Sequence, residues 1–360
     1  MFVRNCWYVA AWDFDVPADR PYALTIADEP IVLFRTENGG IAALEDRCCH
    51  RFAPLSMGRI EDGCHLRCMY HGLKFDAKGV CIEIPGQDKI PATARVRSFP
   101  VTERHSWVWV WLGDPDKADD SLIPQAVGFD DPNYVLRAGH IDYQAYYQLI
   151  NDNLTDFSHL SYVHANSFGA TDAWANSRPQ VRRIDRGIRV SRWLLQKDAM
   201  KEGKAAGMKS SDGALWQTYD FLAPGILLMY SATYPAEVMP ADGVSSPEGE
   251  PISANFTSQA VTPMRGNTAR YFYSWGPRRK DGGEEMADQM FAVAQMAFAE
   301  DREIIEAQQR VIDLKPGAEV LTSADVGPVQ MRSVIRQLFR AENQQEPGTA
   351  EADAALEPVT

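Results

Sequence analysis

Two pairs of metal-ligating side chains lie near the start of the chain, Cys48-x-His50 and Cys68-x-x-His71. Two thiolates and two imidazoles can hold a zinc ion, or a [2Fe–2S] cluster in which one iron takes both Cys and the other takes both His. Zinc modules usually place their Cys pair before their His pair, whereas each pair here contains one of each type. The interleaved order favours a redox-active cluster over a structural zinc ion.

A second group of candidate ligands follows in the pattern Asn153-x-x-Asp156-x-x-His159-x4-His164. Asp156 and His159 share one face of a helix, but His164 lies roughly 140° further around a regular helix. Both imidazoles reach one metal ion only if the helix bends or ends between them. Taken alone, they could equally be ordinary histidines beside a helix cap. Two imidazoles and one carboxylate form the iron(II) site of non-haem oxygenases, which leaves positions open for dioxygen.

Asp301 is the predicted third ligand of this iron. It lies on the apolar stripe of a predicted long helix, where a carboxylate is costly unless it binds a cation or forms a buried salt bridge. Glu300, Glu303 and Glu306 fall off the stripe and are expected to be solvated. The stripe consists of Met286, Met290, Ala294, Ala297, Phe298, Ile305 and Ile312.

The remaining polar residues of the second group receive separate predictions. Asp156 could be a ligand, or it could accept a hydrogen bond from a histidine and so link the two centres. Asn153 is expected to face the open side of the iron. Asp152 receives no role.

Short β-rich runs and turns predict a first domain over residues 1–117. Its strands are expected at 31–34, 41–44 and 107–112, and a Gly-Asp-Pro-Asp stop follows the last of them. Pro85-Gly86 could supply a third loop that shields the cluster from water.

The catalytic domain is expected over residues 118–342, and its first part, 118–142, is expected to be a connector from the first domain. A helix over 146–163 and a long helix over 284–313 are predicted to flank strands near 188–195, 215–222, 226–234, 254–262 and 268–275. Loops 200–214 and 239–253 could act as lids. The tail 343–360 has few large apolar residues and is expected to be disordered.

Composition argues against several classes of protein. The formal charge of −13 disfavours nucleic acid as a partner. No apolar run approaches the ~18 residues of a membrane span, and the N-terminus lacks the pattern of a signal peptide. The six Cys do not form a disulfide framework once two are assigned to a cluster, so a reducing compartment, the cytoplasm, is expected.

The two ligand patterns together resemble those of the Rieske non-haem iron aromatic oxygenases, over about residues 1–340. The opening M-F-V-R-N-C-W-Y-V-A-A-W and the Cys48-Cys49-His50-Arg51 variant are similar to one branch. That branch contains the oxygenase components of vanillate O-demethylase, dicamba O-demethylase and toluenesulfonate methyl-monooxygenase. The resemblance implies an α+β chain, with an all-β Rieske domain followed by a helix-grip catalytic domain of antiparallel sheet and helices.

The resemblance also implies cofactors and partners. The cluster would be held by Cys48, His50, Cys68 and His71, and a mononuclear iron(II) with O2 as cosubstrate by His159, His164 and Asp301. A homotrimer is implied, in which His71 contacts Asp156 of the next subunit, and Asp156 in turn holds His159. Since the sequence has no flavin or nicotinamide motif, electrons are expected from NADH through a separate reductase, with or without a ferredoxin.

The expected reaction is hydroxylation of an alkyl carbon on an aromatic substrate, which leads to O- or N-dealkylation. Ring dihydroxylation, or methyl hydroxylation of an aryl sulfonate or carboxylate, is the alternative on the same machinery. A non-enzymatic electron carrier is the remote alternative, because a carrier needs no second metal site.

The substrate is predicted to be largely apolar, such as an aryl ether or an N-alkyl anilide. All seven His lie at or before position 164, so none comes from the strands expected to wall the pocket. Arg189, Arg192 or Arg270 could reach inside, although exposed strand arginines are commoner. The expected wall residues are Trp216, Tyr219, Phe221, Leu227, Met229, Tyr230, Phe256, Tyr271, Phe272, Met290 and Phe291.

Overall fold

The computed structural model describes residues 1–201 and 213–344, and these residues form two compact units. The N-terminal unit comprises residues 2–130 and 262–267. The C-terminal unit comprises Met1, residues 131–261 and the chain from 268 onward. Each unit contains one of the two groups of candidate ligands. The domain boundary near residue 117 stays a prediction.

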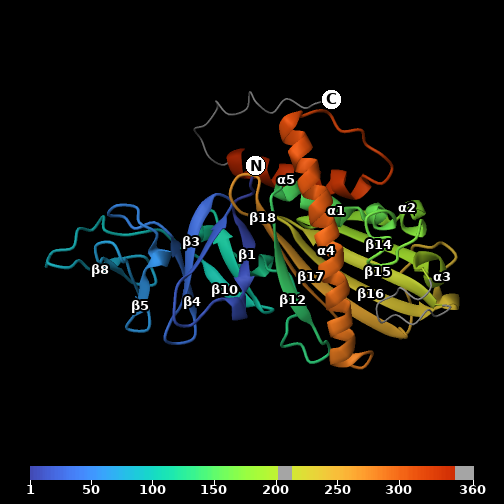
Figure 1. Ribbon diagram of the computed structural model, residues 1–360, viewed down its shortest axis with the longest axis horizontal. Helices are drawn as coiled ribbons and strands as arrows, with labels where there is room; N and C mark the ends of the chain where they lie inside the picture. The colour runs from blue at the N-terminus through green and yellow to red at the C-terminus, as the bar shows by residue number, and fades with distance from the viewer. Residues whose placement is uncertain (202–212, 345–360) are drawn as a thin grey trace. The chain divides into compact units, whose positions relative to one another are not determined.

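The N-terminal unit consists of three antiparallel sheets (Figure 1). β11 (Trp107–Leu112) is the central strand of the first sheet, and all six of its side chains are buried. Burial on both faces explains why this strand reads as a continuous apolar run rather than an alternating one. The sheet orders are β1-β11-β10 (Cys6–Trp12, Trp107–Leu112, Val101–Arg104), β2-β3-β4-β9 (Tyr22–Ile26, Glu29–Arg35, Ile41–Glu45, Ser98–Phe99) and β5-β6-β7-β8 (Arg59–Glu61, His65–Arg67, Lys74–Phe75, Cys81–Glu83).

The C-terminal unit is built on a seven-stranded antiparallel sheet. Its order is β12-β18-β17-β16-β15-β14-β13, so consecutive strands from β13 to β18 are also neighbours in space. The five strands predicted between 188 and 275 are all confirmed. The bounds are Arg137–Tyr143, Gln180–Ile184, Gly187–Leu195, Gly213–Leu222, Ile226–Pro235, Ser253–Pro263 and Ala269–Pro277 for β12 to β18.

The long helix α4 (Gly283–Leu314) runs across one face of this sheet beside β12 and β18 (Figure 1). Its buried side chains include Met290, Ala294, Phe298, Asp301 and Ile305, which confirms the predicted stripe. The stripe ends earlier than predicted, because the last turns of α4 extend past the sheet and leave Ile312 exposed.

The helix predicted over 146–163 is two shorter elements. The α-helix α1 (Tyr147–Thr155) ends because Asp156 adopts an extended conformation, with φ −133° and ψ 107°. The side chain of Asp156 then caps the 3₁₀ helix η5 (Phe157–Ser161) by accepting the Ser158 N–H. The chain therefore changes direction between His159 and the helix that precedes it.

The helix α5 (Val326–Gln344) was not anticipated, and it packs against α1. Gly327 of α5 approaches so closely that a Cβ atom there would lie 2.2 Å from the Thr155 carbonyl oxygen. Arg332 of α5 forms an ion pair with Asp152 of α1, which gives Asp152 the structural role that its sequence context did not suggest.

Two further differences from the predictions concern segments outside these helices. Strand β12 begins inside the segment predicted as a connector and ends one residue beyond it. The loop 239–253 contacts β14 through the Trp193 indole N–H, which donates to the Ser245 carbonyl, and its role as a lid stays a prediction. The short helices α2 (Ala173–Asn176) and α3 (Gln196–Ala199) were not predicted. Most of the predicted loop 200–214 and tail 343–360 lies outside the described residues.

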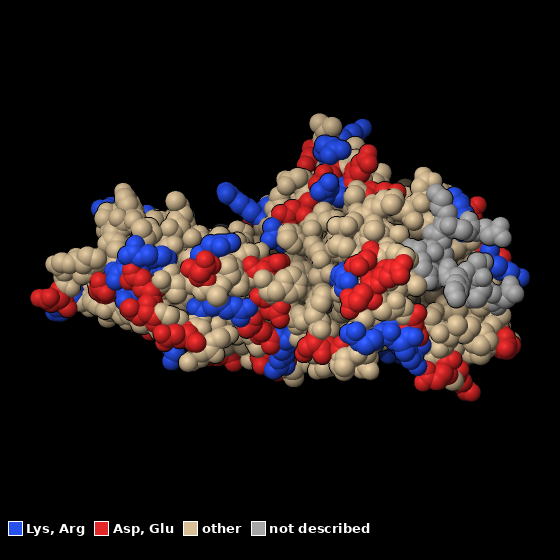
Figure 2. All heavy atoms as spheres, turned by 60° about the horizontal axis from the view of Figure 1, so that its bottom comes forward, with Lys and Arg blue, Asp and Glu red and all other residues tan. Residues whose placement is uncertain are grey.

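None of the helices in the described residues has the length and apolar character needed to cross a membrane. On the face drawn in Figure 2, acidic and basic side chains are interspersed in small groups. The net charge of −13 is therefore not gathered into a single patch on that face.

We expect Gly327→Ala to destabilise the fold by about 1–3 kcal/mol, because the added methyl group forces α5 away from the Thr155 carbonyl. Urea unfolding followed by far-UV circular dichroism measures this change. Gly317→Ala is the matched control, since a Cβ there meets nothing within 4 Å. Equal stability of the two variants would contradict the close packing of α5 on α1.

Candidate metal centres

The two Cys–His pairs lie on loops with the same hydrogen-bonding pattern. The Cys48 N–H donates to the Ala53 carbonyl at 2.9 Å, and the Cys68 N–H donates to the Leu73 carbonyl at 2.8 Å. In both loops the Cys carbonyl accepts an N–H from the residue four positions on, Phe52 or Gly72. These two residues have φ values of 60° and 76°, which turn the chain back on itself.

The thiols point inward and the imidazoles point outward. Cys48 and Cys68 are each 2% exposed and belong to the core formed around Leu66 and Phe75. His50 and His71 are exposed, and their ring centroids lie 4.5 Å apart. All six Cys of the chain are free thiols.

The four side chains fit a [2Fe–2S] cluster. Burial, together with the adjacent Cys68 thiol, raises the pKa of the Cys48 thiol to about 12. A thiol in such surroundings ionises only with a strong positive charge beside it, which iron would supply. The predicted third loop packs against the second pair, since a Cβ at Gly72 would lie 2.7 Å from Pro85 Cγ.

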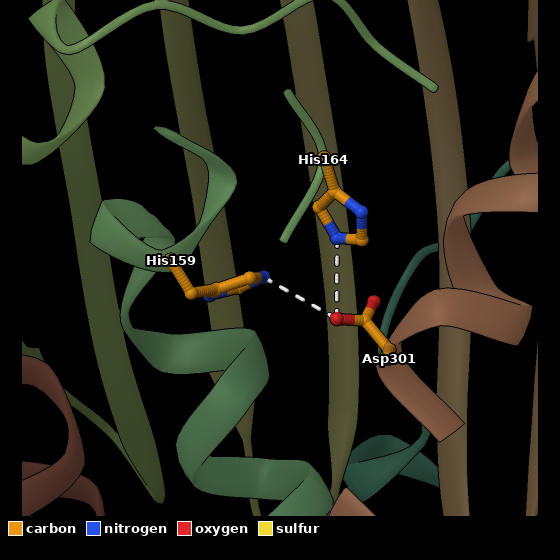
Figure 3. A group of neighbouring side chains, drawn as sticks. All are labelled: His159, His164 and Asp301. Carbon is orange, nitrogen blue, oxygen red and sulfur yellow. Dashed lines mark ion pairs between the residues drawn. The ribbon is translucent and has the colours of Figure 1, made fainter. Parts of the chain in front are cut away.

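The second group of ligands converges in the C-terminal unit (Figure 3). His159 comes from η5, His164 from the loop after it and Asp301 from α4, and their candidate ligand atoms lie within 4.8 Å of one another. Asp301 Oδ1 is 3.1 Å from His164 Nε2 and 3.6 Å from His159 Nε2. Two imidazole nitrogens and one carboxylate oxygen facing a common point can hold one iron(II) ion.

Glu300 is the functional candidate that sequence reasoning missed. Its Oε2 atom lies 2.9 Å from His164 Nδ1 and accepts the Ser167 hydroxyl at 2.5 Å. The prediction that Glu300 is merely solvated is therefore wrong, because the loop after η5 folds back over this turn of α4. A carboxylate on the far nitrogen of a ligating histidine fixes the ring orientation.

The two imidazoles differ in their electrostatic surroundings. Burial lowers the pKa of His159. Burial also acts to lower the pKa of His164, but the carboxylates of Asp301 and Glu300 outweigh it and raise that pKa overall. His164 is thus held between two acidic residues that are neighbours in the chain.

Asn153 and Asp156 flank the three ligands. Asn153 Nδ2 donates to Asp301 Oδ1 at 3.0 Å and lies 3.4 Å from His159 Nε2. His159 Nδ1 lies 2.6 Å from the backbone carbonyl oxygen of Asp156. This contact is with the backbone of Asp156 and not with its carboxylate. Both carboxylate oxygens of Asp156 accept hydrogen bonds from Ser158, one from its N–H at 2.8 Å and one from its hydroxyl at 3.0 Å.

A cavity of about 850 Å³, counting its open mouth, adjoins the three candidate ligands. Its apolar lining comes from α1, η5, the loop after η5, α2, the residue that follows α3, the sheet and α4. Its uncharged polar lining comes from the sheet alone, apart from Asn153. The main apolar residues are Leu154, Phe157, Leu160, Phe168, Trp174, Met229 and Trp275.

The predicted pocket wall is largely wrong. Of the eleven large residues predicted to form it, only Met229 lines the cavity. Trp216 and Tyr230 belong to the opposite face of the sheet, where they pack with Trp193. Because side chains alternate along a strand, the cavity face carries the other parity, including Leu215 and Gln217. Alternation was the available signal for Trp216, Tyr230, Phe256 and Phe272. It was no signal for Tyr219, Phe221, Leu227 and Tyr271, which have the parity of the cavity face but do not line the cavity.

None of the three candidate arginines lines the cavity. Arg189 of β14 forms an ion pair with Asp220 of β15, and Arg270 of β18 forms one with Asp142 of β12. The Arg192 guanidinium is buried behind the rings of Phe157 and Trp174, 5.5 Å from each ring centroid. It donates to the Ser177 hydroxyl at 3.2 Å.

Comparison with known proteins gives matches along both units. Residues 6–100 match the Rieske [2Fe-2S] domain, and residues 143–341 match the vanillate O-demethylase oxygenase C-terminal domain. The iron–sulfur subunit of the toluene-4-sulfonate monooxygenase system from Comamonas testosteroni is 38% identical over 350 residues, covering 95% of this chain and 99% of that protein.

Two further matches extend over nearly the whole chain. The oxygenase component of chloroacetanilide N-alkylformylase from Rhizorhabdus wittichii is 30% identical, covering 95% of this chain and 97% of that protein. The crystal structure of dicamba monooxygenase bound to dicamba has a TM-score of 0.81 at 30% identity, covering 95% of this chain and 99% of that one. The family resemblance and the fold class predicted from the motifs are confirmed.

We expect Cys48→Ser to abolish the visible colour of the purified protein and its bleaching by dithionite, since one thiolate ligand of the cluster is lost. Absorption spectra and assays of iron and acid-labile sulfide measure the change. The adjacent Cys49→Ser is the control and is expected to keep the cluster. A colourless Cys49→Ser protein with a coloured Cys48→Ser protein would reverse the assignment.

We expect Glu300→Gln to weaken metal binding at His159, His164 and Asp301 by about 10–100-fold, because His164 loses its orienting carboxylate. Titration of the iron-free mononuclear site with Co(II), followed by visible absorption, measures the affinity. Glu303→Gln removes the same charge from an exposed position on the same helix and is the control. Identical affinities for the two variants would exclude the orienting role.

Proposed function

This chain belongs to the Rieske oxygenases with a vanillate O-demethylase-type catalytic domain, and from that membership we propose that it removes alkyl groups from aromatic ethers or anilides. It is an enzyme, the oxygenase component of a Rieske monooxygenase. The observation that carries the proposal is the opening of the 2-His-1-carboxylate group onto a largely apolar cavity. An alkyl carbon held in that cavity lies beside an oxygen-activating centre.

The two metal sites have different roles in the proposed reaction. When bound, the [2Fe–2S] cluster supplies single electrons and the mononuclear iron(II) activates dioxygen. We assign Cys48, Cys68, His50 and His71 to the cluster and His159, His164 and Asp301 to the iron. Asn153 holds the Asp301 carboxylate through its Nδ2 atom, and Glu300 orients His164.

The reaction consumes one dioxygen, two electrons and two protons for each alkyl group removed. One oxygen atom enters the C–H bond of the alkyl carbon next to O or N, and the other leaves as water. The resulting hemiacetal or hemiaminal releases an aldehyde and leaves a phenol or an amine. Phe157, Phe168 and Trp174 provide apolar surfaces that position an aromatic ring and exclude water from it.

Electrons reach the chain from a separate reductase that uses NADH, with or without a ferredoxin. The exposed imidazoles of His50 and His71 are the outer edge of the cluster site and suit electron exchange there. We propose a homotrimer in which His71 of one subunit meets Asp156 of the next. Ser158 supports this role, because its two hydrogen bonds fix the direction of the Asp156 carboxylate.

We expect the holoenzyme, supplied with NADH and a surrogate reductase, to release formaldehyde from methyl aryl ethers or N-methyl anilides in proportion to the oxygen consumed. Formaldehyde and the phenol or aniline product are measured together. The His159→Ala variant is expected to keep the reducible cluster and lose product formation. A cis-diol product, or full turnover by His159→Ala, would contradict the proposal.

A further inference from the structure

We propose that Gln217, Ser231 and Asn255 form a recognition row that binds a neutral hydrogen-bonding group on the substrate, such as a secondary amide, and disfavours carboxylates and sulfonates. The inference rests on the proposed function and names the substrate class of the same cavity. Apolar surfaces that stack on an aromatic ring do not fix which end of the substrate faces the iron. Hydrogen bonds to the recognition row would fix that orientation.

The three residues are direct cross-strand neighbours. Gln217 of β15 pairs with Ser231 of β16, and Ser231 pairs with Asn255 of β17. Directly opposite residues point to the same face of a sheet, and all three line the cavity. Adjacent strands lie about 4.8 Å apart, so the row presents polar atoms over roughly two strand spacings.

The orientation of the Asn255 amide is fixed by its surroundings. The Trp275 indole N–H donates to Asn255 Oδ1 at 2.8 Å. An indole nitrogen can only donate, so this contact identifies the accepting atom as oxygen and leaves Nδ2 as the free end. Asn255 therefore offers hydrogen-bond donors to the cavity.

Gln217 offers the complementary acceptor. The residue is 6% exposed, and its Oε1 atom is buried with no hydrogen-bond partner within the described part of the chain. A buried amide oxygen without a partner costs free energy that a ligand N–H or O–H would recover. Donor and acceptor at the two ends of the row match the C=O and N–H of a secondary amide.

A second buried oxygen makes the cavity unfavourable for anions. Thr257 uses its hydroxyl proton to donate to the Ser274 carbonyl at 2.6 Å, so it must accept from Gln259 Nε2 at 3.1 Å. That contact leaves Gln259 Oε1 buried and unpartnered. A carboxylate or sulfonate placed against Gln217 and Gln259 would meet two amide oxygens, which repel it.

No lining side chain among the described residues is cationic. The nearest candidate, Arg192, lies directly opposite Gln217 on β14 but does not line the cavity. Its guanidinium is 5.5 Å from the ring centroids of Phe157 and Trp174, which do line it. An anion placed beside the row would therefore lose its hydration without gaining an ion pair with a described lining side chain. Neutral substrates avoid this cost.

Four matched probes test the inference by equilibrium calorimetry on the reduced holoenzyme without dioxygen. All carry an aryl methyl ether, and they differ only at the para position. 4-Methoxyacetanilide has a secondary amide, 4-methoxy-N-methylacetanilide lacks the N–H, 4-isobutylanisole replaces the amide by an apolar group of similar size, and 4-methoxybenzoate is anionic. We expect the secondary amide to bind about tenfold more tightly than each of the other three.

The variant Gln217→Met replaces the amide by an unbranched apolar side chain and should abolish this preference. We expect about tenfold weaker binding of 4-methoxyacetanilide and unchanged or tighter binding of 4-isobutylanisole. Leu215→Met, on the same cavity face of β15, is the control for cavity shape and should change all probes alike. Unfolding curves and iron content establish that both variants are intact.

Three outcomes would overturn the inference. They are binding of 4-methoxybenzoate as tight as that of the amide, an unchanged amide preference in Gln217→Met, and the absence of measurable amide binding. Because no dioxygen is present, the ranking does not depend on turnover. Failure of all probes to release formaldehyde in air would instead contradict the proposed function, while an inverted ranking with normal ether cleavage contradicts only this inference.

Discussion

The buried carboxylate of Asp301 is the constraint on which the C-terminal unit depends. It is 4% exposed on the apolar stripe of α4, where a negative charge is costly unless its surroundings satisfy it. His164 and Asn153 both reach its Oδ1 atom, and His159 lies next to them. These three partners come from three different segments, so satisfying one carboxylate requires α1, η5 and the following loop to meet α4.

The end of η5 at Ser161 makes this convergence possible. A continuous helix would direct His159 and His164 to different sides, whereas the helical turn ends between them and His164 follows in a loop. The position of α1 is in turn fixed by α5, through the ion pair between Arg332 and Asp152 and the close approach of Gly327. A segment near the end of the chain thus supports the geometry of residues 153–164.

The sequence was sufficient to predict five of the seven strands of the large sheet and three side chains that converge beside α4, because both depend on local signals. The strands are runs of β-branched and aromatic residues bounded by turns, and Asp301 is a charge within an apolar stripe. The role of Glu300 was not predictable, since it depends on a loop folding back from a distant segment. The cavity wall was mispredicted because large residues were chosen by type. Strand parity excludes some of them, such as Trp216 and Tyr230, while Tyr219 and Phe221 have the parity of the cavity face but do not line the cavity. Strand β12 was missed because its short mixed pattern has few buried positions.

Two sides of the cavity carry different kinds of side chains. The groups that can hold iron come from η5, the loop after it and α4, whereas the uncharged polar row comes from the centre of the sheet. Substitutions at strand positions 217, 231 and 255 change neither the sequence nor the helices that carry the iron ligands. Substitutions at these sheet positions can therefore change which compounds bind, while the residues that can hold the iron stay the same.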